Sequence, residues 1–376
     1  MTSTWPGAAP CHPLGLRRRA LLLCYRQPVS KDLRRPAPTL EDVAKVAGVS
    51  RATVSRVING KRKVAPAVQE VVLEAVAETG YVPNRAARSL VTRRTGTVAV
   101  VISGADADPD AELDLSGVFS DPFFGRVVGS LVRTLRPHDV HPVLMFADNG
   151  QTRNQVVSYL RFGNADGALL VSTYADDPLP EELLGTGSPI VLFARPGRPI
   201  PASYVDLANA DGARLAANHL LNRGCQRLGV ISGPVDVPSA RDRLDGFRDA
   251  AARRGHAFVP SVEGSFTFES GETAMAELLA AAPDLDGVFV SNDLMAQGAI
   301  HVLQVNGRRV PEDVAIVGFD DSPVAVQTRP RLTTVRQPVE KMAEEMARML
   351  LEQIDADEPA VRSAIFEPVL VVRDSA

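Results

Sequence analysis

The N-terminal part of the chain carries hydrophobic residues at helical spacing. The first such segment begins at Leu40, ends before Gly48, and has one apolar stripe. Thr39 and Asp42 stand three residues apart just before it, which is the spacing of a capping box. The pattern therefore predicts a helix over residues 40–47.

Two more amphipathic helices are predicted downstream. Ser50 can cap a helix over residues 51–58, and Pro66 stands at the first turn of a helix that reaches about residue 79 and ends at Gly80. Two short helices joined by a glycine turn, with a third that closes their core, are typical of a helix-turn-helix head. A three-helix packing unit without a nucleic-acid partner would show the same pattern, so both interpretations stay open at this point.

If the head binds DNA, its second helix enters the major groove with its N-terminal residues first. Arg51 and Arg56 lie away from the apolar stripe, and an arginine there can donate two hydrogen bonds to one guanine. Lys63 belongs to a basic loop that we expect to contact phosphates. The predicted DNA contacts in the head are Thr39, Ser50, Arg51, Ala52, Thr53, Ser55, Arg56, Asn59 and Lys63.

From residue 97 onward, short β-branched runs alternate with amphipathic helical segments. The runs TVAVVIS, HPVLMF, DGALLV and SPIVLF form a first group, and RLGVIS, DGVFVS and DVAIVGF form a second. Such alternation predicts an α/β body of two doubly wound parallel sheets, with a ligand at the carboxyl ends of the strands. The sequence contains no glycine-rich phosphate loop, metal-ligand cluster or nucleophile elbow. We therefore expect a binding protein with no cofactor and no metal, and an enzyme is the weaker alternative.

The charge is divided unevenly along the chain, although the net charge is only −4. Residues 1–30 carry four arginines and no acid, and residues 31–94 carry 13 Lys/Arg against 6 Asp/Glu. Residues 95–376 carry 24 Lys/Arg against 39 Asp/Glu, a balance of −15. A basic head before an acidic body favours a polyanion partner for the head, although a solvated basic face would look the same.

Targeting signals are weak in this chain. Arg17–Arg19 followed by Ala20–Leu23 and Cys24 imitates a lipoprotein signal, but its apolar core of four residues is too short for a signal peptide. Three widely spaced cysteines form neither a disulfide framework nor a metal cluster. We expect residues 1–37 to be a disordered extension and the protein to be cytoplasmic, without a membrane span.

The segment from Thr39 to Gly96, which ends in YVPNRAARSL and the residues after it, resembles the head and hinge of the LacI/GalR (lactose and galactose repressor) family. This resemblance implies that a hinge helix folds on operator DNA, where Leu90 of each protomer wedges between base pairs in the minor groove. The implied hinge contacts are Asn84, Arg85, Ala87, Arg88 and Leu90.

The resemblance continues over the body and implies the bilobed fold shared with periplasmic sugar-binding proteins. Residues matching Arg241, Asn292 and Asp320 bind sugar hydroxyls in such relatives, and those matching Phe124 and Phe266 cover the ring. The chemistry fits, since carboxylate, guanidinium and amide groups bind hydroxyls and aromatic faces cover apolar C–H patches. The implied effector site is Asp121, Phe123, Phe124, Ser172, Arg195, Ser239, Arg241, Phe266, Asn292 and Asp320.

Several nearby residues have competing interpretations. We favour a structural salt bridge for Arg243 and a core position for Phe123, and Asp293 is equally consistent with a helix cap and a pocket residue. Ala194 stands where relatives often carry an aspartate, so we expect an altered ligand preference near Arg195. Residues 104–118 form a long acidic insertion that we expect to be a surface loop near the pocket mouth.

The sequence thus predicts an extension over 1–37, a DNA-binding head over 38–82, a hinge over 83–96 and a bilobed body over 97–376. Lobe 1 is expected to comprise about 97–194 and 323–345, and lobe 2 about 195–322 and 346–373. The chain ends without the heptad tail that makes the lactose repressor a tetramer, so we expect a homodimer. The expected function is a repressor of palindromic operators controlled by a sugar. A purine or nucleoside effector, or an exported sugar-binding protein, are the alternatives.

Overall fold

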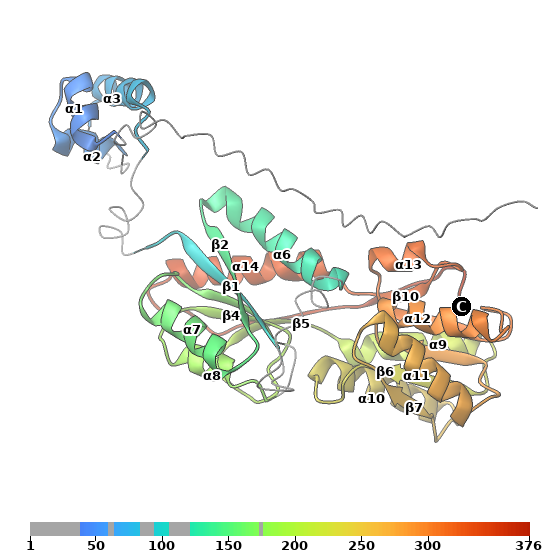
Figure 1. Cartoon of the computed structure of the whole chain (residues 1–376). Coiled ribbons are helices and arrows are strands. Elements are labelled where there is room, and N and C mark those ends of the chain that lie inside the picture. Colours follow the sequence, from blue (N-terminus) through green and yellow to red (C-terminus); the bar gives the residue numbers. More distant parts are fainter. Residues whose placement is uncertain (1–37, 59–63, 83–93, 105–120, 173–175) are drawn as a thin grey trace, which may run out of the picture. The chain divides into compact units, whose positions relative to one another are not determined.

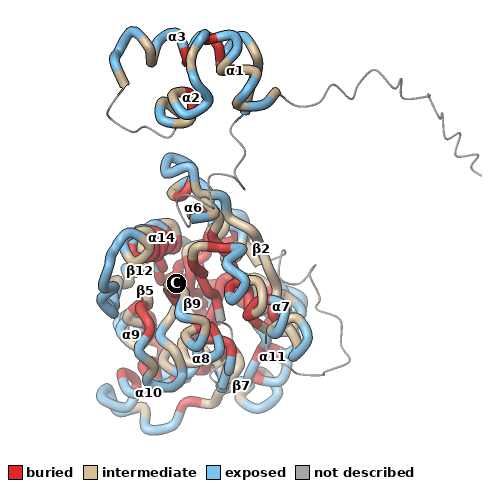
Figure 2. The backbone as a smooth tube through the Cα atoms, turned by 90° about the vertical axis from the view of Figure 1, so that its left-hand side faces the viewer, coloured by how far each residue is buried: buried red, intermediate tan, exposed pale blue. Residues whose placement is uncertain are grey.

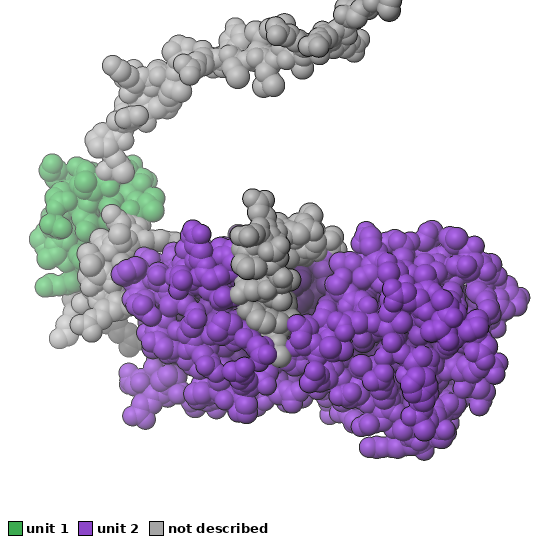
Figure 3. All heavy atoms as spheres, turned by 60° about the horizontal axis from the view of Figure 1, so that its bottom comes forward, with its two compact units in different colours: residues 1–83 green, residues 84–376 purple. Residues whose placement is uncertain are grey.

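The computed structural model describes residues 38–58, 64–82, 94–104, 121–172 and 176–376 (Figure 1). The chain divides into two compact units, residues 1–83 and 84–376 (Figure 3). The first contains the predicted head and the second contains the predicted body. Most of the predicted hinge lies outside the described residues, as do the predicted extension and almost all of the acidic insertion.

The head consists of helices α1 (Leu40–Ala47), α2 (Arg51–Ile58) and α3 (Pro66–Thr79), as the hydrophobic pattern predicted. The capping box at the start of α1 is formed, with the Thr39 backbone N–H and Oγ1 donating to Asp42 at 2.9 and 2.8 Å. Gly48 follows in the left-handed conformation, with φ of 63°, which favours glycine. Ser50 Oγ accepts from the Thr53 backbone N–H at 3.2 Å, so the predicted cap of α2 is confirmed. The three helices share a small core of Val43, Ala47, Val54, Val72 and Ala75.

Lobe 1 of the body contains a six-stranded parallel sheet in the order β11-β5-β4-β3-β1-β2. Its strands are almost wholly hydrophobic at the centre, as expected for a sheet that helices cover on both faces. The strands are β1 (Thr97–Ser103), β2 (His141–Ala147), β3 (Ala168–Ser172), β4 (Ile190–Phe193), β5 (Ser203–Leu207) and β11 (Ser363–Phe366). The helices are α6 (Pro122–Leu135), η2 (Arg136–His138), α7 (Gly150–Arg161), α8 (Leu179–Leu184) and α14 (Val339–Asp355).

Lobe 2 contains the second sheet, in the order β12-β10-β9-β8-β6-β7, with only the edge pair β10–β12 antiparallel. Pro238 stands in the first turn of one of its helices, and Asn292 caps the start of another. The strands are β6 (Leu228–Ser232), β7 (Ser261–Glu263), β8 (Gly287–Val290), β9 (Ala315–Asp320), β10 (Thr333–Arg336) and β12 (Val369–Val371). The helices are α9 (Asn209–Asn222), α10 (Pro238–Arg253), α11 (Phe268–Ala281), α12 (Asp293–Val305) and α13 (Pro323–Gln327).

The predicted division of the body into lobes was wrong. Strand β5 pairs with β4 in lobe 1, although residues after 194 were expected in lobe 2. Strand β10 was expected in lobe 1, but it pairs with β9 in lobe 2. The second half of α14 was expected in lobe 2, but α14 packs on α6 and on the lobe 1 sheet. The chain therefore crosses between the lobes after β5, after β10 and after β11. The alternation of strands and helices does not say which sheet a strand joins, because pairing is decided by contacts far apart in sequence.

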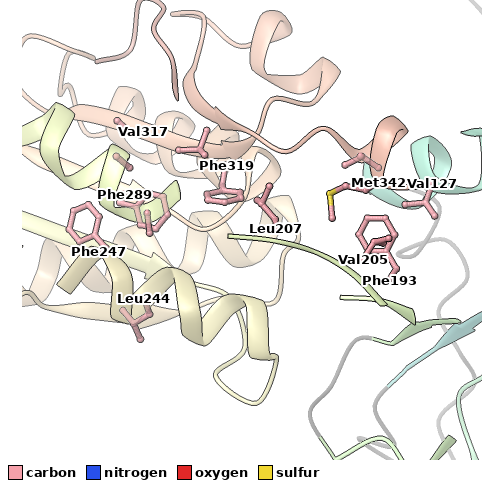
Figure 4. Close-up of a cluster of buried hydrophobic side chains, with 14 of the residues drawn as sticks. Val127, Phe193, Val205, Leu207, Leu244, Phe247, Phe289, Val317, Phe319 and Met342 are labelled. Atoms are coloured by element: carbon pink, nitrogen blue, oxygen red, sulfur yellow. The ribbon is translucent and has the colours of Figure 1, made fainter. Parts of the chain in front are cut away.

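One buried cluster continues from lobe 1 into lobe 2. Figure 4 shows Val127, Phe193 and Met342 on the lobe 1 side and Phe289 and Phe319 on the lobe 2 side. Figure 2 shows burial along the backbone, with buried residues gathered in the interior of the body and exposed residues on the outer turns of the helices. Because the cluster lies beneath the crossovers, it fixes the strand ends from which the functional side chains project. In the described ranges, none of the helices has the length and apolarity that crossing a membrane requires.

Candidate functional site

A cavity of about 380 Å³ lies between the lobes at the carboxyl ends of their strands. This cavity, called the effector cavity below, is lined by side chains from both lobes, as the doubly wound topology predicts. Seven of the ten predicted effector residues line it: Asp121, Phe123, Phe124, Ser239, Phe266, Asn292 and Asp320. They come from separate segments of the chain, so only the fold brings them together.

The buried guanidinium of Arg243 is at the centre of the polar wall. It donates through Nε to Asn209 Oδ1 at 2.9 Å, through Nη1 to the Ser291 carbonyl at 2.6 Å, and through Nη2 to Gln337 Oε1 at 3.3 Å. Nη1 lies 3.6 Å from Asp320 Oδ1, and the group stacks 3.7 Å from the centroid of the Phe319 ring. Arg243 therefore has the structural role that the sequence suggested. It also lines the cavity, which the sequence did not suggest.

Arg241, in contrast, does not line the effector cavity, contrary to the expectation from the sequence. Its exposed side chain folds back, with Nε donating to the Val235 carbonyl at 3.1 Å. Arg241 and Arg243 are two positions apart on α10, and side chains at that spacing leave a helix in nearly opposite directions. The buried face of α10 includes Arg243, so this residue and not Arg241 faces the ligand space.

Of the two other predicted residues, Arg195 does not line the cavity, and the side chain of Ser172 is not described. Arg195 follows β4, but its Nη2 pairs with Asp242 of lobe 2 at 2.9 Å, outside the effector cavity. Ser172 is the last residue of β3, and its side chain lies outside the described part of the structure. The Arg195–Asp242 pair joins the lobes beside the cavity.

Three carboxylates face Arg243 around the cavity. Asp121 caps α6 and accepts from the Phe123 N–H at 2.9 Å, and Asp206 accepts from the Leu207 N–H at 2.8 Å. Asp320 ends β9 with φ of 107°, a strained conformation for a residue with a side chain. Burial is the largest influence on each of these groups, and it raises the pKa of all three carboxyls.

Aromatic rings form much of the remaining wall. Phe123 makes edge-to-face contacts with Phe124 and Phe193, each with ring centroids 5.3 Å apart. Phe123 also packs against the shared core, so the core interpretation and the ligand-wall interpretation both hold for it. Phe266 has φ of 64°, and a Cβ placed on Gly233 would lie only 2.2 Å from its ring. The ring of Phe266 can occupy this position because Gly233 has no side chain.

Asn292 and Asp293 have different roles. Asn292 Oδ1 caps α12 by accepting from the Met295 N–H at 2.9 Å, and its Nδ2 donates to the Phe266 carbonyl at 2.9 Å. Asp293 is buried outside the cavity, where it accepts from Thr334 Oγ1 at 2.5 Å and from the Ser322 N–H at 2.7 Å. Burial raises the pKa of Asp293 to about 7. Asp293 is therefore neither the cap nor a pocket residue, but links α12 to the segments around β9 and β10.

Sequence reasoning missed several polar residues of the cavity, notably Asp206, Asn209 and Gln337. All three stand at crossovers between the lobes: Asp206 lies near the end of β5, Asn209 begins α9 just after β5, and Gln337 directly follows β10. A polar residue at the end of a buried strand was the available signal, and it is the same signal that identified Asp320.

In the head, the N-terminal part of α2 presents the predicted DNA-contacting residues to solvent. Ser50, Arg51, Ala52 and Arg56 are exposed, while Thr53 and Ser55 are half-buried. Arg51 pairs with Glu41 at 3.1 Å, but both side chains are exposed and such pairs are readily exchanged for another anion. Thr39, the predicted contact just before α1, is also exposed. The other seven predicted DNA contacts lie outside the described residues: Asn59, Lys63, Asn84, Arg85, Ala87, Arg88 and Leu90.

Comparison with known proteins places this arrangement in a family. Residues 39–84 match the family model described as bacterial regulatory proteins, lacI family, and residues 217–376 match a periplasmic binding protein-like domain. The chain is 44% identical to the HTH-type transcriptional regulator CelR of Thermobifida fusca over 346 residues, which are 91% of this chain and 99% of that protein. The chain belongs to the lacI family of bacterial regulatory proteins.

Solved structures of the lacI family agree with this result. A transcriptional regulator CelR–cellobiose complex is 42% identical, with a TM-score of 0.70 over 90% of this chain and 100% of that chain. A lac repressor dimer bound to operator and the anti-inducer ONPF is 25% identical, with a TM-score of 0.76 over 90% of this chain and 98% of that chain. As a member of the lacI family, the protein is a DNA-binding transcriptional regulator and not an enzyme.

Proposed function

We propose that the protein is a homodimeric, cytoplasmic repressor whose affinity for a palindromic operator is set by a sugar bound in the effector cavity. The observation that carries this proposal is the convergence of Arg243, Asp320, Asn292 and the aromatic walls from both lobes. Carboxylate, guanidinium and amide groups bind vicinal hydroxyls, and the Phe124 and Phe266 faces suit the C–H patches of a sugar ring. The similar CelR–cellobiose complex makes cellobiose the first candidate effector.

The balance of charge favours an uncharged sugar. Arg126 is already paired with Glu340 at 2.7 Å and Arg195 with Asp242 at 2.9 Å. Arg243 faces Asp121, Asp206 and Asp320 together, so carboxyl groups outnumber guanidinium groups among the described residues that line the cavity. A phosphorylated or acidic sugar would add negative charge to this surplus.

The same geometry supports a route from the effector cavity to the hinge. Helix α14 begins at the second crossover, where Glu340 binds Arg126, whose Nη1 also donates to the Asp320 carbonyl at 3.3 Å. At its other end, the Ile354 carbonyl accepts from Arg94 Nη2 at 2.7 Å, and Arg94 also pairs with Asp355. Arg94 lies at the end of the hinge. A ligand that favours one arrangement of the lobes therefore shifts this anchor, and the coupling must be reciprocal between sugar and operator.

DNA binding by the exposed face of α2 and sugar binding by the body should be separable by mutation. Arg56→Ala is expected to lower operator affinity at least tenfold, roughly the contribution of a bidentate base contact, and to leave sugar affinity unchanged. Asp320→Asn should weaken sugar binding and leave operator binding without sugar nearly intact. Fluorescence anisotropy with a labelled palindrome and titration calorimetry with cellobiose measure the two affinities.

The exposed Arg253 on α10 provides the control, since Arg253→Ala changes charge without touching either site. Equal loss of both activities in the Arg56 and Asp320 variants would contradict the proposal. A nucleobase panel should be titrated alongside the sugars, because an aromatic-lined cavity can also hold a flat ring. If only nucleobases bound, the effector would be of the purine type and the proposal of a sugar effector would be wrong.

A further inference from the structure

A second cavity lies directly beside the effector cavity. An adjoining cavity of about 120 Å³ shares Phe193, Ala194, Val237 and Ser239 with the effector cavity. A third cavity of about 750 Å³ shares Arg195 with the adjoining one, along with neighbouring residues of the same loop. These two cavities, called the outer groove below, are lined by segments 176–181 and 192–204 of lobe 1 and by segment 235–242 of lobe 2.

The outer groove has the lining of a saccharide site. Its apolar floor includes Ile200, Tyr204 and Pro238, and its polar rim includes Arg195, Arg241 and Asp242. Proline, isoleucine and tyrosine surfaces accommodate the C–H face of a sugar ring, while guanidinium and carboxylate groups bind its hydroxyls. Arg195 and Arg241 are predicted effector residues that do not line the effector cavity, and both line this groove instead.

The two arginines are held in place by the protein. Arg195 pairs with Asp242 across the lobes at 2.9 Å, and Arg241 donates through Nε to the Val235 carbonyl at 3.1 Å. A guanidinium has five N–H donors, and each of these contacts employs one of them. Both side chains remain accessible, with 52% of the Arg195 side chain exposed. A hydroxyl in the groove can therefore bind an arginine whose position is already fixed, at a low cost in side-chain entropy.

We propose that the outer groove is a second saccharide subsite, and that the effector is an uncharged oligosaccharide with at least one ring bound beyond the effector cavity. This inference rests on the proposed function, because it extends the same cleft. A ring in the outer groove contacts segment 194–200 of lobe 1 and segment 235–242 of lobe 2. The Arg195–Asp242 pair joins these two segments. The ring therefore adds to the stabilisation of one lobe arrangement as well as to affinity.

The test is a chain-length series on the full-length protein. Calorimetry with glucose, cellobiose, cellotriose and cellotetraose should show affinity rising about tenfold or more when a ring reaches the groove, as one charge-assisted hydrogen bond would give. Arg241→Ala and Ile200→Ala should each remove most of this gain and leave the affinity for the next shorter sugar unchanged. Arg248→Ala serves as the matched control, because Arg248 is exposed on the same helix but bonds Ser261 outside the groove.

The possible results distinguish failure of the outer subsite from failure of the proposed function. If cellobiose or a longer sugar alters operator affinity but no added ring tightens binding, the outer subsite is overturned and the sugar-responsive function stands. The outer subsite is also overturned if the Arg241 and Arg248 variants weaken the binding of all chain lengths alike. If no sugar of any length binds, the proposed function itself fails.

Discussion

The Arg243 guanidinium and the Asp320 carboxylate lie 3.6 Å apart at the base of the cleft, both almost fully buried. The two side chains come from α10 and from the end of β9, and the ring of Phe319 lies against the guanidinium. This pair is part of the internal structure of lobe 2 and also part of the cavity wall. Substitutions here should therefore affect stability and effector binding together.

Replacing Arg243 should be costly in both respects. Arg243→Ala leaves Asp320 buried without its cation, so unfolding of the body should become easier by about 3–5 kcal/mol. Arg243→Lys keeps the charge but loses the fork of donors that reaches Asn209, Ser291 and Gln337, so it should recover part of the stability and little sugar affinity. Thermal unfolding and calorimetry measure the two effects. If the Arg243→Ala variant bound the sugar with wild-type affinity, Arg243 would not be part of the sugar-binding site.

Anionic derivatives of the effector should be rejected. Two unit charges about 5 Å apart repel by roughly 3 kcal/mol at an effective dielectric constant of about 20. Cellobiose 6-phosphate should therefore bind at least about 100-fold more weakly than cellobiose. Asp121→Asn removes one negative charge and preserves a good helix cap. It should therefore reduce the ratio of the affinity for cellobiose to the affinity for cellobiose 6-phosphate. Asp245→Asn, which changes an exposed residue of α10, should leave this affinity ratio unchanged. Equal effects of both variants would show that the ratio depends on the net charge of the protein and not on the cavity.

Adding a methyl group at Gly233 should displace Phe266. The new Cβ would lie 2.2 Å from the Phe266 ring, which is the movable end of a side chain, so the ring should shift at little cost to folding. Gly233→Ala is expected to lower sugar affinity by up to about tenfold, the contribution of one aromatic contact. The melting temperature should change little. Gly150→Ala, where the nearest atom to the added Cβ is 3.8 Å away, is the control.

Asp293 should make the stability of the body depend on pH in an unusual direction. Its pKa is raised to about 7 by burial, whereas an unfolded aspartate titrates near 3.8. Between these values the folded state holds a proton that the unfolded state has lost, so this group's contribution to stability falls as pH rises from about 4 to 7. Relative to Asp293→Asn, the wild type should lose stability across this range. A difference in melting temperature that stays constant from pH 5 to 8 would contradict the assignment.

The capping box of α1 should matter for DNA binding alone. Thr39→Ala removes the side chain of the cap and should destabilise the head by about 1 kcal/mol. Operator affinity should fall, while sugar affinity should stay at the wild-type value because the effector cavity belongs to the other unit. Anisotropy and calorimetry on the same preparation test this, and Thr39→Ser should restore operator binding.

The head was predictable in detail because its determinants are local. A capping box, an apolar stripe and a left-handed glycine each act within one or two helical turns, so α1, α2 and α3 have the predicted bounds. The individual strands of the body were predictable for a similar reason, since runs of β-branched residues favour extended structure over a few positions.

The effector site was predictable only where the position along the chain fixed the direction of the side chain. Polar residues at or just after the end of a buried strand, such as Asp320 and Asn292, must emerge at the carboxyl edge of the sheet, where the cavity lies. The choice between Arg241 and Arg243 had no such local signal. It depends on which face of α10 is buried, and that face is set by packing against α9.

Helices, strands, the uneven division of charge and the motifs of a lacI-family regulator can thus all be read from the amino-acid sequence. The sheet that β5 and β10 join, the arginine that faces the cavity and the internal role of Asp293 are visible only in the folded chain. The difference lies in the range of the interactions. Caps and periodicity act over a few residues, whereas strand pairing and the burial of charged groups depend on partners far away along the chain, which meet only when the chain has folded.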